Sequence, residues 1–97
     1  MRIAFLGDTA FFGRNTAQNK EYKKRLAPIK ASLETCDCII ANLECPITIQ
    51  SKVVGGKSAY LKAKPDDIEI LKYLGITHVT LANNHIYDYG AKGLSDT

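Results

Sequence analysis

The sequence of 97 residues contains no tryptophan and only two histidines and three prolines. It also has no apolar run approaching the roughly 20 residues that a membrane-spanning helix requires. Residues 1–7 are mostly apolar, but Asp8 follows at once, so this segment is too short and too quickly polar for a signal peptide. We therefore expect a chain without a membrane span that is located in the cytoplasm.

The three cysteines, Cys36, Cys38 and Cys45, are odd in number and lack the two-residue spacer of zinc ribbons and redox motifs. Side chains two residues apart on a strand point the same way, which suits packing better than chelation for Cys36 and Cys38. The pattern predicts buried, reduced thiols in a reducing compartment. A pair of thiolate metal ligands is the alternative.

Hydrophobic residues make up 45% of the chain and charged residues 24%, with a net charge of +3, which is ordinary for a globular protein. The basic residues Lys20, Lys23, Lys24 and Arg25 fit the solvated face of a helix, although a phosphate or nucleic-acid patch would also be basic. No aromatic residues lie between them, as a single-strand binding surface would need. We therefore expect no nucleic-acid partner.

Apolar runs alternate with helical patterns along the chain. We predict strands at residues 3–6, 38–41 and 76–82, and helices around residues 22–33, after Pro65 up to Gly75, and from Gly90. Pro28 predicts a kink or a restart of the first helix. This order predicts an α/β fold with a mostly parallel sheet, flanking helices and right-handed crossovers.

Three finer predictions concern burial and turns. The strands at residues 3–6 and 38–41 read as buried, the second of them on both faces. The second helix should bury one face, and the glycines near Val54 should form a hairpin turn or an excursion loop. The predicted buried face consists of Ile68, Leu71 and Leu74.

Each predicted strand ends in polar residues. In parallel sheets the ligand crevice lies beyond the carboxyl ends of the strands, so these residues should meet at one edge. Carboxylates, amide oxygens and an imidazole suit a divalent ion such as Mn²⁺, Mg²⁺, Fe²⁺ or Zn²⁺. Two such ions could hold a phosphate ester and activate water. The residues are Asp8 after the first strand, Asn42 and Glu44 after the second, and Asn84 and His85 after the third.

Each of these residues also has a structural explanation when taken alone. Asp8 could end a turn, Asn42 and Glu44 could cap a helix, and His85 could be a hydrogen-bonded side chain. His78, within the third predicted strand, is expected to have no function. Gly56-Lys57-Ser58 imitates the end of a phosphate-binding loop, but Ser51 stands where that loop needs glycine.

Three segments together resemble the bacterial capsule-synthesis (CapA-like, poly-γ-glutamate capsule biosynthesis) family. They are Gly7-Asp8, the Asn-Leu-Glu-Cys-Pro segment at 42–46, and the Asn-Asn-His-Ile-Tyr-Asp-Tyr-Gly segment at 83–90. The resemblance covers residues 1–97 as the amino-terminal, incomplete part of a domain. It implies the α/β sandwich of calcineurin-like metallophosphoesterases, whose central sheets are flanked by helices.

The same resemblance implies roles for individual residues. Asp8, Asn42, Glu44 and Asn84 correspond to metal ligands of that superfamily, and His85 corresponds to the histidine beside the attacked phosphate. Asp88 corresponds to an acid that orients His85 or caps the last helix. Ala10 stands where many metallophosphoesterases have a histidine ligand, and the histidines that complete the metal site would come after Thr97.

Two hypotheses follow from the resemblance. One is a metal-dependent, phosphoesterase-like hydrolase of capsule or envelope-polymer metabolism, acting on a phosphoester or polymer-related substrate and inactive as residues 1–97 alone. The other is a non-catalytic accessory or scaffold component of polymer synthesis. In either case an exposed sheet edge predicts pairing with another chain or with further protein.

Overall fold

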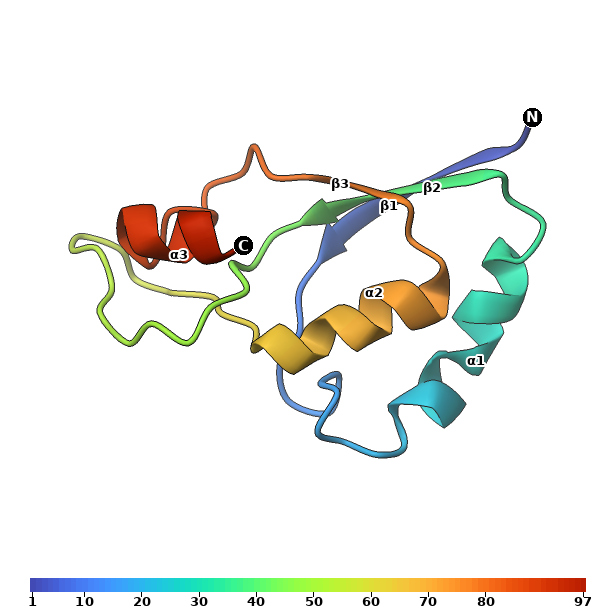
Figure 1. The fold of residues 1–97 in the computed structure, drawn as a ribbon, viewed down its shortest axis with the longest axis horizontal. Coiled ribbons are helices and arrows are strands. Elements are labelled where there is room, and N and C mark those ends of the chain that lie inside the picture. The colour runs from blue at the N-terminus through green and yellow to red at the C-terminus, as the bar shows by residue number, and fades with distance from the viewer.

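The computed structural model describes all residues 1–97 and contains one small sheet with helices around it (Figure 1). The carboxyl ends of the strands point toward a long loop and the last helix. The elements are β1 (Ile3–Thr9), α1 (Tyr22–Leu33), β2 (Cys38–Leu43), the 3-10 turn η1 (Pro65–Asp67), α2 (Ile68–Leu74), β3 (His78–Thr80) and α3 (Gly90–Asp96).

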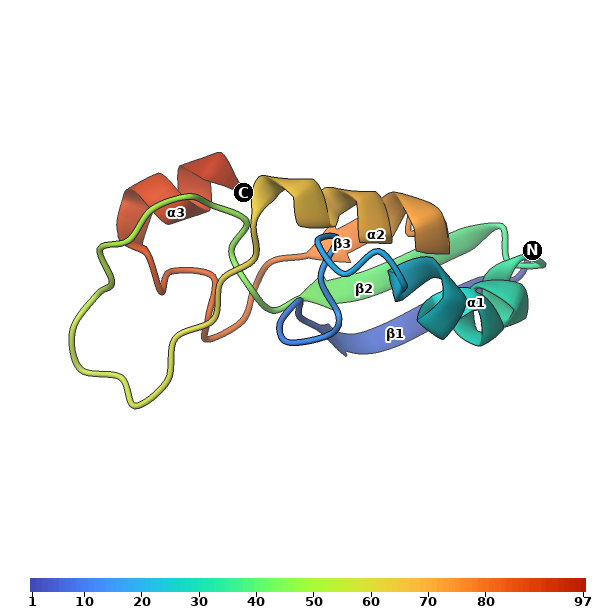
Figure 2. The same ribbon diagram turned by 90° about the horizontal axis from the view of Figure 1, so that it is seen from below.

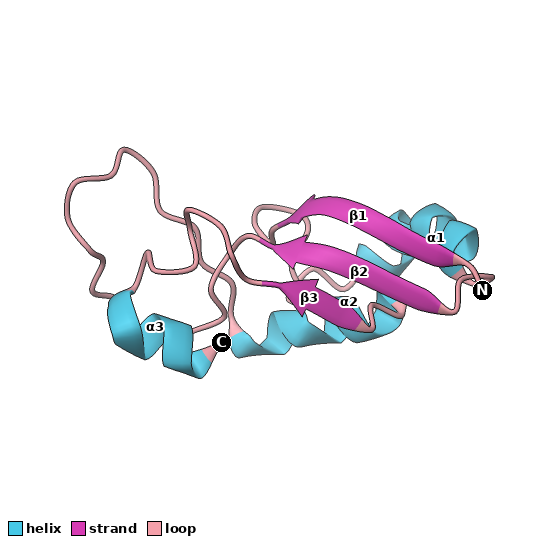
Figure 3. Cartoon of the chain, turned by 90° about the horizontal axis from the view of Figure 1, so that it is seen from above, coloured by secondary structure: helices cyan, strands magenta, loops and turns pink.

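The sheet has the order β1-β2-β3, and both neighbouring pairs are parallel. The predicted α/β fold with a parallel sheet is therefore confirmed. The two crossovers step across the sheet in the same direction, so crossovers of one hand place both helices on one face. Figures 2 and 3 show α1 and α2 together on that face.

The opposite face of the sheet carries no helix in this chain. Phe5 of β1 is 76% exposed and Ile3 is 45% exposed, whereas Ala4 and Leu6, which alternate with them, pack against the core. In β2 the burial also alternates, with Ile39, Ala41 and Leu43 buried. The prediction of buried strands was therefore right for the helix-covered face alone, because nothing in residues 1–97 covers the other.

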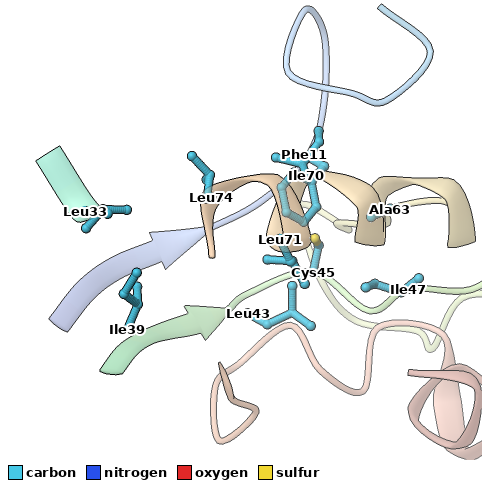
Figure 4. Packing of buried hydrophobic residues seen from close by; sticks show 10 residues of the cluster. All are labelled: Phe11, Leu33, Ile39, Leu43, Cys45, Ile47, Ala63, Ile70, Leu71 and Leu74. Atoms are coloured by element: carbon cyan, nitrogen blue, oxygen red, sulfur yellow. The ribbon is translucent and has the colours of Figure 1, made fainter. Parts of the chain in front are cut away.

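The core forms where α2 lies across β2 (Figure 4). Ile39 and Leu43 project from β2 toward Leu71 and Leu74 of α2. Each buried aliphatic side chain of this kind contributes about 1.5–3 kcal/mol relative to an exposed one. The remaining buried members of the cluster are Phe11, Leu33, Cys45, Ile47, Ala63 and Ile70.

The first two helices differ in detail from the sequence prediction. α1 is one continuous helix that runs through Pro28, so the helix does not restart there. In α2 the buried residues include Ile70 as well as Leu71 and Leu74, whereas Ile68 is 43% exposed. The face turned to the core is thus rotated from the predicted one and includes Ile70 in place of Ile68. Gly75 ends α2 with φ 74°, as its position predicted.

The third strand and the middle loop are less regular than predicted. β3 covers only His78–Thr80 of the predicted 76–82, and all three residues are exposed. No hairpin forms around Val54. Residues 49–62 make an excursion loop, closed at its base by a parallel bridge between Ile47 and Ala63. Gly56 in this loop has φ 86°, the conformation that favours glycine.

The cysteines are free, but only Cys45 is fully buried. Cys36 and Cys38 were predicted to lie on one face of a strand. That prediction is wrong, because Cys36 lies in the turn before β2. The basic residues from Lys20 to Arg25 are exposed, as expected of a solvated face. None of the helices has the length and apolar character needed to cross a membrane.

Candidate functional site at the strand carboxyl ends

A bulge in β1 brings Asp8 beside β2. Phe5 pairs with Ile40 and Asp8 pairs with Asn42, so β1 uses three residues where β2 uses two. Without the extra residue, Gly7 would pair with Asn42 and Asp8 would fall on the helix-covered side. The bulge therefore places the Asp8 carboxylate in register with the Asn42 amide.

Asn42 is the centre of a row of side chains that crosses all three strands. Its Nδ2 donates to Asp8 Oδ1 at 2.7 Å. Its Oδ1 accepts from Thr80 Oγ1 at 3.1 Å and from Asn83 Nδ2 at 3.1 Å. The amide oxygen of Asn42 is thus occupied by two donors, and its amide nitrogen faces Asp8.

Asp8 and Glu44 form a pair of neighbouring carboxyl groups. The hydrogen bond from Asn42, followed by that from Glu44, lowers the pKa of Asp8. The Asp8 carboxylate, followed by loss of hydration, raises the pKa of Glu44, and the nearby His85 acts in the opposite direction. The ionisation states of the two carboxyl groups are therefore linked, because ionisation of Asp8 opposes ionisation of Glu44.

One oxygen of this pair lacks a partner. Glu44 Oε2 is buried and has no hydrogen bond within the protein. An unpartnered buried carboxylate oxygen is costly, and it is a common feature of sites that bind a cation or perform chemistry. This oxygen is the strongest local sign that the strand ends form a site.

His85 is held at the edge of this pair by contacts on both sides. Its backbone N–H donates to Asn83 Oδ1 at 3.1 Å. Its ring Nδ1 lies 2.7 Å from Asp88 Oδ2. Because a carboxylate can only accept, this contact requires a proton on Nδ1 and leaves Nε2 free for another partner.

Asp88 is completely buried, and both of its oxygens are occupied. Oδ1 pairs with the Lys57 ammonium, and Oδ2 accepts from the backbone N–H of Leu61 at 2.7 Å as well as from His85. Burial by itself raises the pKa of Asp88, but the Lys57, Leu61 and His85 donors outweigh it and hold the pKa below its usual value. Of the two roles considered for Asp88, this geometry supports orienting His85, and its side chain does not cap α3.

Asn84 differs from its neighbours. It is exposed, and its side chain makes no hydrogen bond to the protein, while its backbone carbonyl accepts from Lys57. The structure thus brings Asp8, Asn42, Glu44 and His85 to one end of the sheet, with Asn84 on the surface beside them. Sequence reasoning missed Asn83, which links β2 to the His85 turn, and Lys57.

The donor set satisfies part of what a divalent metal needs. Nowhere in the chain do three or more histidine, cysteine, aspartate or glutamate side chains gather in a group that could hold an ion. Asp8 and Glu44 nevertheless provide two adjacent carboxylates, one with an orphaned oxygen, which is chemistry suited to a hard cation. The residues present fit one side of such a site, and further ligands would have to come from elsewhere in the protein.

Comparison with known proteins identifies relatives of this chain. Relatives of known description include the capsule biosynthesis protein CapA of Bacillus anthracis, 38% identical over 67% of this chain and 16% of its own length. The PGA biosynthesis protein CapA of Bacillus subtilis is 34% identical over 100% of this chain and 26% of its own length. A probable polyglutamine synthesis accessory protein of Mycobacterium tuberculosis is 38% identical over 63% of the chain and 16% of its own length.

The chain therefore spans about a quarter or less of the length of these relatives. The family described as bacterial capsule synthesis protein PGA_cap matches residues 2–97, nearly the whole chain. The resemblance read from the three strand-end segments is thus confirmed. The chain belongs to the bacterial capsule synthesis protein (PGA_cap) family.

Proposed function

We propose that this chain forms one wall of a divalent-metal site in a protein of capsule or poly-glutamate biosynthesis, and that the complete site hydrolyses a phosphoester or a related bond. The observation that carries the proposal is the Asp8–Glu44 carboxyl pair with its unpartnered, buried Glu44 Oε2 beside His85. The names of the relatives support the biological setting, since two are capsule or PGA biosynthesis proteins.

In this proposal Asp8 and Glu44 supply carboxylate oxygens to the ion, and the exposed Asn84 amide supplies a further oxygen. Asn42 holds Asp8 in place through its amide nitrogen. A bound divalent ion would polarise the substrate oxygen and lower the pKa of a bound water. His85, with its proton on Nδ1 facing Asp88, would use the lone pair of Nε2 as a general base that accepts a proton from the attacking water.

A second candidate is a non-catalytic accessory component that keeps this fold. Two observations favour it: one relative is described as an accessory protein of polyglutamine synthesis, and Ala10 stands where the superfamily often has a histidine ligand. The accessory candidate needs no metal turnover. It predicts that the unpartnered Glu44 oxygen is satisfied by another part of the protein.

Metal binding and turnover by the natural full-length protein separate the two candidates. After chelation and dialysis, calorimetry with Mn²⁺ and Zn²⁺ should show micromolar binding that Glu44→Gln abolishes. Hydrolysis of bis(p-nitrophenyl) phosphate should depend on the metal and fall about 10²- to 10⁴-fold in His85→Ala. Glu34→Gln, at an exposed carboxylate after α1, serves as the matched control.

Unchanged turnover in His85→Ala and Asp8→Asn would exclude the catalytic proposal. Full-length protein that binds neither ion, with no hydrolysis, would establish the accessory candidate instead. Micromolar binding that Glu44→Gln leaves intact would place the metal elsewhere in the protein.

A further inference from the structure

The excursion loop, residues 49–62, is tied to the His85 turn by several contacts although the two are far apart in sequence. The backbone N–H of Val54 donates to the Asp88 carbonyl at 2.9 Å, and that of Leu61 donates to the Asp88 carboxylate at 2.7 Å. Lys57 adds its ammonium, which contacts both Asp88 Oδ1 and the Asn84 carbonyl. The loop therefore supplies most of the surroundings of Asp88.

Lys57 is directed inward by its neighbours in the loop. Gly56 before it has φ 86°, and the backbone N–H of Lys57 donates to the Tyr60 hydroxyl at 3.3 Å. The Lys57 side chain is only 27% exposed, and its ammonium meets a carboxylate that is fully buried. The ion pair is stabilised in this place because the buried Asp88 carboxylate cannot replace the Lys57 ammonium with solvent water.

The contacts of Asp88 make its orientation depend on Lys57. Oδ2 serves His85 and Leu61, and Oδ1 has the Lys57 ammonium as its partner. Without Lys57, Oδ1 would be a buried charge lacking a donor, and the carboxyl group would have to rotate or take up water. Either change would alter the acceptor that fixes the proton of His85 on Nδ1.

We infer that Lys57 is a positioning residue of the strand-end site, which holds the Asp88 carboxylate and the Asn84 carbonyl so that the His85 ring keeps one orientation and one tautomer. The inference deepens the proposed function, because His85 is the group that the hydrolase would use. It assigns a purpose to a Gly-Gly-Lys segment that resembles a phosphate-binding loop without being one. It concerns the imidazole itself, so it can be tested without any turnover.

The test uses the full-length protein labelled with ¹⁵N-histidine, with the His85 ring signals assigned by their loss in His85→Gln. Long-range ¹H–¹⁵N correlation spectra distinguish the Nδ1–H from the Nε2–H tautomer. The unchanged protein should show a single Nδ1–H form. Lys57→Met, which removes the ammonium and keeps much of the side-chain length, should show a mixture of tautomers or a broadened ring.

Two control variants separate positioning from general effects of the loop. Lys62 also anchors the loop, through the Gln50 carbonyl at 2.7 Å and by lying 4.9 Å from the centre of the Tyr89 ring, but it does not touch Asp88. Lys62→Met should therefore keep the single His85 tautomer. Lys52→Met, at an exposed lysine of the same loop, should also leave the ring unchanged.

A retained single Nδ1–H form in folded Lys57→Met would overturn the inference, and so would an equal loss of that form in Lys62→Met. If Lys57→Met does not fold, Lys57→Arg and Lys57→Gln decide. The charged variant should keep the tautomer and the shorter neutral one should lose it, while equal behaviour of the two would refute the inference.

Where metal-dependent hydrolysis is present, Lys57→Met should lower kcat on the order of 10- to 100-fold with little change in KM. Absence of hydrolysis in the unchanged protein would count against the proposed function alone. The imidazole spectra would still decide the role of Lys57.

Discussion

Asp88 and the Asp8–Glu44 pair lie at the same end of the sheet, yet their surroundings are opposite. Asp88 is fully buried and receives an ammonium, a backbone N–H and an imidazole N–H. The other two carboxyl groups have each other as close charged neighbours, and one oxygen of Glu44 is buried without a donor. The hydrogen-bond donors around a carboxyl group, and not its burial alone, therefore determine whether its ionised form is stabilised.

This contrast distinguishes a carboxylate that stabilises the fold from carboxyl groups that are candidates for a functional role. A buried carboxylate whose acceptors are all used adds to order, and removing it leaves its donors stranded. Two adjacent carboxyl groups without a cation oppose each other, and such arrangements cluster at functional sites. Asp88 is thus a fully partnered carboxylate, while Asp8 and Glu44 are the groups to which the proposed function assigns the metal.

The largest expected effect is the loss of the satisfied carboxylate. Asp88→Ala should lower the free energy of unfolding of the full-length protein by about 3–5 kcal/mol, because it removes the partner of the half-buried Lys57 ammonium and strands the Leu61 N–H. Urea denaturation followed by circular dichroism measures this. Asp66→Ala, at an exposed acid in the first turn after Pro65, is the control and should cost less than about 1 kcal/mol. Equal losses of unfolding free energy in Asp88→Ala and Asp66→Ala would show that the Asp88 carboxylate has no special stabilising role.

The unsatisfied pair should respond in the opposite direction. Glu44→Gln replaces a carboxyl group by a neutral amide that can donate to Asp8, so it should raise the melting temperature of the protein kept in a chelator. Thermal denaturation with and without Mn²⁺ measures the effect, and the same change should abolish stabilisation by the metal. Glu69→Gln, in an exposed pair with Lys72, should change neither quantity. A lower melting temperature in chelator would contradict the comparison.

The two groups should also give opposite pH dependence in the metal-free protein. Glu44 has its pKa raised above 4.5 by Asp8, so its stabilising contribution is complete below that pH and is lost as the pH rises through its folded pKa. Asp88 has its pKa lowered below 3.8, so its contribution is present above that pH and is lost on acidification through its folded pKa.

Urea denaturation at a series of pH values tests these signs. Glu44→Gln should remove the loss of stability that occurs as the pH rises through the folded pKa of Glu44. Asp88→Asn should weaken the loss of stability that occurs on acidification. If Glu44→Gln instead makes stability fall more steeply with increasing pH, then Glu44 is stabilised as a carboxylate and the Asp8–Glu44 pair is not repulsive.

The smallest expected effect concerns the row that joins the strands. Thr80→Val removes one of the two donors to Asn42 Oδ1 and leaves Asn83 in place, so stability should fall by about 0.5–1.5 kcal/mol. Metal affinity should change little, because Asn42 keeps its bond to Asp8. A large loss of affinity in Thr80→Val would show that the cross-strand row acts as part of the site itself.

Local pattern was enough to predict several parts of the molecule. The helix from Tyr22 to Leu33, the stop at Gly75 and the start at Gly90 depend on periodicity and on a left-handed glycine, which are properties of short segments. The parallel sheet followed from the alternation of strands and helices. The gathering of Asp8, Glu44 and His85 followed in turn, because parallel strands end at a common edge.

Other features depend on contacts between distant segments and could not be read locally. Ile70 rather than Ile68 is buried, because the core that α2 shares with β2 is formed by residues from distant segments. Asn83, not considered as a partner of Asn42, is placed by the path of the chain after β3. The inward direction of Lys57 depends on a loop whose sequence carries no period.

The sequence by itself determined the family, the α/β order and the kinds of side chain that stand at the strand ends, because these follow from motifs and local periodicity. Only the tertiary structure decided how those side chains are partnered. A one-residue bulge places Asp8 beside Asn42, and a loop brings Lys57 to Asp88, 31 residues later in the chain. The charge state and orientation of a carboxylate are set by atoms within a few ångströms, and the fold alone brings those atoms together.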